Sequence, residues 1–177
     1  YPTADQPLLH TDNPRLQKLF YAGINTLRNS ALETFTDGMA RERQQYTGDG
    51  CHEVMAFSYL YGMGDPLVRR FFETTSDGQS TDGYYLDCWP ACDRMQRLSQ
   101  AQLGLTIWAP ILDHAFQLIL EVRRYAFHTG DRSIPKKCLE GFLRFYNYMC
   151  GLIEDDGLLP VENLGTVSVW IDHTTFR

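Results

Sequence analysis

The sequence predicts an all-α domain built of stacked helical hairpins. Apolar residues recur at helical spacing over most of the chain, and only the last residues suggest a short strand. In addition, a Gly-Asp pair twice separates two helical segments, in "MGDPLVRRFF" and in "TGDRSIPKKCLEGFLRFY". Glycine suits the left-handed end of one helix and Asp caps the next, so the 66-residue spacing of Gly64 and Gly130 predicts repeated hairpins. The alternative is that Gly-Asp is ordinary helix punctuation without a repeat.

The first helix follows an extended lead-in. Residues 1–12 carry two prolines and no periodicity, so we separate them from a domain that covers residues 13–177. Asp12 or Asn13 is the expected cap of the helix, and Pro14 suits its first turn. The apolar pattern then continues toward residue 35.

Two further helices are expected before the middle of the chain. The first of them covers residues 51–63 and has so little polar face that we expect it to be mostly buried. The second covers residues 64–75, with Asp65 as its cap. Residues 76–99 then turn polar and irregular, which predicts a long loop.

The second half of the chain predicts another pair of helices. A long helix runs from Leu103 to His128 and ends in a Gly-Asp corner. Asp131 or Ser133 caps the next helix, which covers residues 133–154. The remaining residues, 155–177, predict a loop with a short strand.

Composition narrows the classes of function. The net charge of -6 has the wrong sign for a protein that binds phosphate backbones, so nucleic acid is not an expected partner. No apolar run reaches the roughly 18 residues needed to cross a bilayer, and no membrane partner is expected. We therefore expect a soluble protein, and its compartment, cytoplasmic or periplasmic and secreted, stays open.

The five cysteines do not resemble a disulfide framework, because they are odd in number and widely scattered. Cys88 and Cys92 in "CWPAC" have the spacing of a metal pair, but no second pair at zinc-like spacing follows. We expect free thiols, with a metal or redox role as the alternative. No cofactor and no catalytic metal are predicted.

The segment "TDGMARERQQYTGDG" at residues 36–50 carries the residue types of an acid-base site. It contains Asp37, Glu42 and Asp49, with Arg41 and Arg43 beside the middle acid. Glycosidic cleavage needs a proton donor at the leaving oxygen and a group that polarises the attacking water, and paired carboxylates supply both. The alternative is a solvated charged loop between two helices.

Two features of composition favour a site over a solvated loop. Three glycines in the segment, Gly38, Gly48 and Gly50, indicate an unusual backbone path. Aromatic residues, on whose rings sugars stack, are also plentiful, although the helix core is the ordinary place for most of them. They are Tyr46, Tyr59, Tyr84, Tyr85, Trp89, Trp108 and Trp170.

The same segment resembles the signature of the bacterial α-L-rhamnosidases of glycoside hydrolase family 78. That signature has an Asp, then an Arg-Glu pair, then an aromatic residue, one variable residue and Gly-Asp. The matching positions in this chain are Asp37, Arg41, Glu42, Tyr46, Gly48 and Asp49. Downstream, "IWAPILDHAFQLILEVRRYAFHTGD" and "VSVWIDH" are similar to later Trp-containing segments of the family, so the resemblance covers nearly the whole chain.

The resemblance implies an (α/α)6 barrel, a six-hairpin toroid, of which this chain would be roughly the first half. It also implies hydrolysis of terminal α-L-rhamnosides with inversion. Glu42 would be the general acid, while Asp37 and Asp49 would hold sugar hydroxyls or support Glu42, and Arg41 would fix a carboxylate or a hydroxyl. The implied contacts to the sugar are Arg41, Tyr46, Trp108, Trp170 and Asp172.

The general base of the family, a Glu well downstream, would lie beyond residue 177. The partners implied are therefore a rhamnoside substrate and the rest of the same catalytic domain, and residues 1–177 alone would be inactive. The chain departs from the family pattern at Gly38-Met39, where Cys or Gly followed by Pro is common, and at Tyr46, where Trp is frequent. Two alternatives stay open, an (α/α)6 glycosidase of another sugar specificity and a helical-hairpin scaffold that binds a partner without catalysis.

Overall fold

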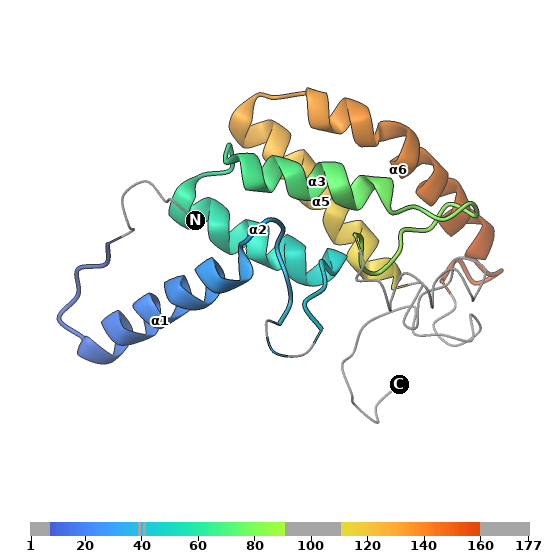
Figure 1. The fold of residues 1–177 in the computed structure, drawn as a ribbon. Helices are drawn as coiled ribbons and strands as arrows, with labels where there is room; N and C mark the ends of the chain where they lie inside the picture. The colour runs from blue at the N-terminus through green and yellow to red at the C-terminus, as the bar shows by residue number, and fades with distance from the viewer. Residues whose placement is uncertain (1–7, 39, 41, 91–110, 160–177) are drawn as a thin grey trace.

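The computed structural model describes residues 8–38, 40, 42–90 and 111–159, and within them it contains α-helices and no strand (Figure 1). The helices are α1 (Pro14–Ser30), α2 (Thr47–Tyr61), α3 (Pro66–Asp77), α5 (Leu112–Thr129) and α6 (Ser133–Leu152). The all-α prediction is confirmed. The expected long helix begins at Leu112, because the backbone of Ile111 before it is extended. Residues 103–110, where the prediction placed its start, and the strand expected near the end lie outside the described residues.

The helices form two hairpins, α2 with α3 and α5 with α6, laid one on the other (Figure 1). Arg124 of α5 donates a hydrogen bond to Tyr59 of α2, and Arg144 of α6 donates one to Gln79 just after α3. Both pairs are 65 residues apart in the sequence. The second hairpin therefore repeats the first in register, which confirms the repeat predicted from the spacing of the Gly-Asp pairs.

Aromatic rings fill the core between the hairpins. Phe35 packs edge-on against Phe57 of α2 and Phe71 of α3, with ring centroids 5.4 and 5.9 Å apart. Phe72 makes a similar contact with Tyr125 of α5 at 5.6 Å. Because Phe35 is fully buried although it belongs to no helix, it fixes the loop between α1 and α2 on the core.

The helix starts follow the predicted capping. The Oδ1 atom of Asn13 accepts hydrogen bonds from the first turn of α1, and Asp65 Oδ1 accepts one from Leu67 N at 2.8 Å. Asp131 does the equivalent for α6, since it accepts from Ser133 N at 2.8 Å although Arg132 occupies the cap position. Both Gly-Asp pairs therefore place an Asp at the start of a helix, as predicted.

At the turn between α2 and α3, the prediction assigned the positive φ to the wrong glycine. Gly130 has a φ of 73° and ends α5 in the left-handed conformation, as expected. At the α2–α3 corner the positive φ, 94°, belongs to Gly62 and not to Gly64. The corner contains two glycines two residues apart, and the helix ends at the earlier one.

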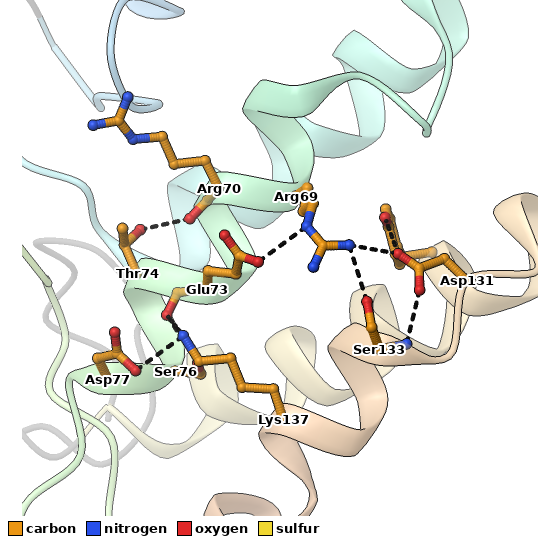
Figure 2. A network of polar contacts seen from close by, with 10 residues as sticks. Arg69, Arg70, Glu73, Thr74, Ser76, Asp77, Asp131, Ser133 and Lys137 are labelled. Atoms are coloured by element: carbon orange, nitrogen blue, oxygen red, sulfur yellow. Dashed lines mark hydrogen bonds and ion pairs between the residues drawn. The ribbon is translucent and has the colours of Figure 1, made fainter.

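Polar side chains connect α3 with the start of α6 (Figure 2). Arg69 binds Asp131 at 2.6 Å and also donates to the hydroxyl of Ser133 at 2.9 Å. One turn further along, Lys137 binds Asp77 at 3.2 Å and donates to the carbonyl of Glu73. These contacts hold the two hairpins in register on the side opposite α2 and α5.

The end of α1 and the start of α2 differ from the prediction. Helix α1 ends at Ser30, because the chain turns back there and Ala31 pairs with Phe35 in an isolated bridge. Helix α2 begins at Thr47 and so includes Asp49 in its first turn. It is also less buried than expected, since the Tyr59 side chain is 77% exposed.

Candidate active site

The loop before α2 is closed by hydrogen bonds between its two ends. Asp37 donates its N–H to the Gln44 carbonyl at 3.0 Å, and its Oδ1 accepts from Gln44 N at 2.9 Å. Inside this closure Arg43 N donates to the carbonyl of Gly38. Because Gln44 is almost fully buried, the loop base is anchored and the Asp37 side chain has a fixed position.

Glu42 lies at the tip of this loop. Its side chain is partly buried, and its carbonyl oxygen accepts a hydrogen bond from Gln44 Nε2 at 2.8 Å. The next residue, Arg43, has a φ of 55°, a left-handed conformation that non-glycine residues rarely adopt. Such backbone strain persists only where the surrounding contacts enforce it, and it is common in functional loops.

The residues that follow the loop are clamped to α3 and to residues 86–89. The Nε2 atom of Gln45 lies 2.9 and 3.0 Å from the Thr74 and Thr75 hydroxyls of α3, and 2.6 Å from the carbonyl of Trp89. Thr47 N then donates to the carbonyl of Asp87 at 2.8 Å. The start of α2 is therefore held by two segments that are distant in the sequence.

Two of the three glycines in the segment permit close packing, and none has an unusual backbone conformation. None of Gly38, Gly48 and Gly50 has a positive φ, so that part of the sequence interpretation was wrong. A Cβ atom on Gly48 would lie 2.5 Å from the His114 ring of α5, and one on Gly50 would overlap the ring of Phe71. These two glycines let α2 approach α5 and α3 closely.

Asp37, Asp49 and Glu53 form an acidic cluster at the start of α2. Asp49 is exposed in the first turn, where the helix dipole favours an acid, and Glu53 lies one turn further on the same face. Burial, together with the charges of Asp49 and Asp37, raises the pKa of Glu53 to about 8. The cluster therefore combines two carboxyl groups with a third that keeps its proton at neutral pH.

His114 borders the cluster from α5. Its ring packs directly on the backbone of Gly48, and burial lowers its pKa although Asp113 and Asp49 oppose this effect. Its Nδ1 atom is buried and has no hydrogen-bond partner among the described residues. A neutral ring at this position brings no positive charge to the acids beside it.

The remaining predicted site residues fall into two groups. The Tyr46 side chain is only 7% exposed, and its backbone pairs with Cys88 in an isolated bridge, so it supports the start of α2 from inside the core. The others lie outside the described residues: Arg41, Trp108, Trp170 and Asp172. The charges of two predicted acids, Asp37 and Asp49, both raise the pKa of Glu53. For the third, Glu42, the structure describes a hydrogen bond that its backbone carbonyl accepts from Gln44.

Sequence analysis missed Glu53 and His114. The signal for Glu53 was present, because an acid in the nearly apolar "CHEVMAF" follows Asp49 by four residues and must share its helix face. His114 gave no such signal, since its role depends on contact with Gly48, 66 residues earlier in the chain. The place of His114 is therefore defined only by the stacking of the hairpins.

Three further properties of the described residues concern metal sites, the state of the cysteines and helices that could cross a membrane. Within them, no group of three or more His, Cys, Asp and Glu side chains is arranged to hold a metal ion. Cys51, Cys88, Cys138 and Cys150 are free thiols, and Cys92 lies outside the described part of the chain. None of the described helices has the length and the apolar character needed to cross a membrane.

Comparison with known proteins gives one family. The profile of the bacterial alpha-L-rhamnosidase 6 hairpin glycosidase domain matches residues 5–171, which include the acidic cluster and the five helices of the described residues. No curated protein and no solved structure matches the chain. The matched family agrees with the resemblance found in residues 36–50 and with the stacked hairpins of the fold.

Proposed function

The chain belongs to the bacterial alpha-L-rhamnosidase six-hairpin glycosidase family, and we propose that it forms part of an inverting glycoside hydrolase that removes terminal α-L-rhamnosyl residues. Its substrate is then a carbohydrate, and the candidate active site lies at the start of α2. The general base is assigned, as the family resemblance implies, to a Glu outside residues 1–177. For this reason the assays described below use the complete catalytic domain.

One observation supports this proposal most strongly. The charges of Asp37, on the loop, and Asp49, on the helix, both act on the same partly buried carboxyl group, that of Glu53. Acids on a solvated surface would diverge into water, whereas acids that converge on one place suit the binding of sugar hydroxyls. The convergence therefore favours a glycosidase site over a helical scaffold with a merely charged surface.

The proposed mechanism assigns one role to each acid. Glu42 gives its proton to the glycosidic oxygen as the bond from this oxygen to the sugar C1 breaks. A water molecule attacks C1 from the opposite face and loses its proton to the general base, which inverts the configuration. Asp37 and Asp49 accept hydrogen bonds from sugar hydroxyls, with Arg41 as a further donor.

For three residues outside the described part of the chain, the proposed role has no structural observation behind it. Trp108, Trp170 and Asp172 are proposed as walls of the sugar pocket, on the family resemblance alone. Tyr46 holds the start of α2 from within the core, so its contribution to the sugar site is support and not stacking.

The substitution Glu42→Gln tests the proposal. On a rhamnoside with a poor leaving group, kcat should fall about 10²- to 10⁴-fold, because the leaving oxygen then departs without a proton. On an activated aryl rhamnoside the loss should be much smaller, and the Kd for L-rhamnose should stay close to that of the wild type. Rates on both substrates and calorimetric binding of L-rhamnose give the comparison.

Glu33→Gln is the matched control, because Glu33 is an exposed acid between α1 and the candidate site. It should leave kcat on both substrates unchanged. Full activity of Glu42→Gln on a natural rhamnoside would exclude Glu42 as the acid. Hydrolysis of another aryl glycoside in preference to the rhamnoside would exclude the proposed sugar specificity but keep the glycosidase assignment.

A further inference from the structure

Gln44 is a buried polar residue that the proposed mechanism does not use. Its side chain is only 1% exposed, although it directly follows two charged residues, Glu42 and Arg43. Glutamine is seldom buried unless its amide group is hydrogen-bonded, because removing an unpaired amide from water costs free energy. The groups that Gln44 binds therefore indicate what its burial achieves.

The backbone of Gln44 is joined to Asp37 in both directions. Its carbonyl oxygen accepts a hydrogen bond from Asp37 N at 3.0 Å, and its N–H donates to Asp37 Oδ1 at 2.9 Å. The second bond is charge-assisted, since the acceptor belongs to a carboxylate. The two residues thus close the loop that contains Glu42, and the backbone of Gln44 determines where the carboxyl group of Asp37 lies.

The side chain of Gln44 turns back toward Glu42. Its Nε2 atom donates a hydrogen bond to the Glu42 carbonyl oxygen at 2.8 Å. Arg43, between the two, has the left-handed φ of 55°, which a non-glycine residue keeps only where its surroundings enforce it. The buried amide of Gln44 supports this turn from inside, and so it fixes the backbone from which the Glu42 side chain extends.

The fold in turn fixes the position of Gln44. The next residue, Gln45, binds the Thr74 and Thr75 hydroxyls of α3 through its Nε2 atom, and its carbonyl oxygen accepts from Trp89 N at 3.1 Å. Gln44 therefore connects the helical hairpins with the tip of the loop. Such a connection matters in an active site, because a reacting group misplaced by about 1 Å can lower the rate about 10²-fold.

We propose that Gln44 is a positioning residue of the candidate active site, whose backbone fixes the carboxylate of Asp37 and whose buried amide fixes the backbone of Glu42. One residue then sets the relative placement of an acid that binds the sugar and the acid that protonates the leaving oxygen. These roles of the two acids rest on the proposed function. The closure of the loop by Gln44 does not, because it depends on hydrogen bonds within the loop.

The substitution Gln44→Met, made in the complete catalytic domain, tests the role in the site. Methionine is similar in length and suits a buried place, but it cannot donate to the Glu42 carbonyl. On a rhamnoside with a poor leaving group, kcat should fall about 10- to 100-fold, because a displaced Glu42 protonates the leaving oxygen less effectively. On an activated aryl rhamnoside, which needs no such proton, kcat should change by no more than about twofold.

Gln79→Met is the matched control. Gln79 also donates from its Nε2 atom to backbone carbonyls, those of Gly83 and Gly141, at 2.6 and 2.7 Å. These partners belong to the loop after α3 and to α6, so the control should lower stability and leave the ratio of the two rates at its wild-type value. An equal loss of kcat on both substrates in Gln44→Met, or no loss on either, would overturn the positioning role.

Hydrogen exchange tests the closure of the loop without any substrate. In the wild type, the Nε2 protons of Gln44 should exchange more slowly than those of the exposed Gln17. In Gln44→Met, the N–H of Arg43, which donates to the Gly38 carbonyl, should exchange faster than in the wild type, and Gln79→Met should leave its rate unchanged. Exchange of the Gln44 amide as fast as that of Gln17 would overturn the proposal, and this result decides if Gln44→Met does not fold.

The results also separate this proposal from the proposed function. If Glu42→Gln shows the dependence on the leaving group and Gln44→Met does not, only the positioning role fails. If neither variant shows it, the assignment of Glu42 as the acid fails, and the role of Gln44 in placing that acid fails with it. Hydrogen exchange then still decides whether Gln44 closes the loop.

Discussion

Asp131 and Glu53 are two carboxyl groups in the same pair of stacked hairpins, and their surroundings differ completely. Asp131 accepts hydrogen bonds from Ser133 N and from the Tyr125 hydroxyl and binds Arg69 (Figure 2). These donors lower its pKa to about 2. Glu53 has a buried oxygen without a partner among the described residues and two acidic neighbours, and its pKa is about 8.

The difference separates a structural carboxylate from one that belongs to a site. All the contacts of Asp131 come from the protein, and they tie the start of α6 to α3 and to the end of α5. At the acidic cluster the charges that act on the partly buried Glu53 are those of two other acids, and a sugar can supply hydrogen-bond donors there.

The largest expected effect on stability comes from a substitution that adds an atom at the close contact between α2 and α5, beside the acidic cluster. Gly48→Ala would place a Cβ atom 2.5 Å from the His114 ring and force α2 away from α5. The free energy of unfolding should decrease by about 1–3 kcal/mol, as for other overpacked contacts. Chemical denaturation of the wild type and the variant measures the difference.

Gly23→Ala is the matched control for this substitution. Gly23 lies within α1, has no positive φ, and its Cβ would meet nothing within 4 Å. Alanine there should stabilise the protein by about 0.5–1 kcal/mol through helix propensity. Equal effects of the two substitutions would show that the close approach of α2 and α5 at Gly48 is not required.

A smaller effect is expected when the structural carboxylate is neutralised. The pKa of Asp131 is lower in the folded protein than its ordinary value of 3.8, so its stabilising effect is complete above about pH 4 and disappears as the pH falls toward 2. Asp131→Asn should lower the Tm at pH 6 and remove this contribution to acid sensitivity. Thermal unfolding between pH 2 and pH 6 checks both.

Asp77→Asn serves as the comparison for Asp131→Asn. Asp77 also pairs with a cation of α6, Lys137, but its side chain is 60% exposed and has a single partner. Its loss should leave the Tm nearly unchanged. A Tm change as large as that of Asp131→Asn would contradict the view that the Asp131 network contributes more than the Lys137–Asp77 pair to joining the hairpins.

Much of the fold could be predicted from local patterns. The apolar periodicity and the capping residues located the helices, and the spacing of the Gly-Asp pairs, 66 residues, is close to the 60 to 65 residues that separate the ion-paired and hydrogen-bonded side chains of the two hairpins. This agreement arises because a repeated hairpin that stacks in register must contact its copy at the repeat distance.

The site was only partly predictable, because burial depends on contacts between distant segments. The types and order of Asp37, Glu42 and Asp49 are local features, and they were recognised. Whether Glu53 lies in water or in a covered position depends on how α2 packs, which its own sequence does not determine. For the same reason, Gly48 was explained by backbone freedom, whereas the structure explains it by the ring of His114.

The central claim, that Glu53 is neutral at physiological pH because the fold buries it beside two acids, is tested most directly by stability against pH. Between the unfolded pKa of about 4.5 and the folded pKa of about 8, the folded state holds more protons, so stability must fall as pH rises. The free energy of unfolding of the wild type, relative to that of Glu53→Gln, should decrease on the order of 2 kcal/mol between pH 5 and pH 8, allowing for partial exposure. A difference that stays constant over this range would contradict the claim.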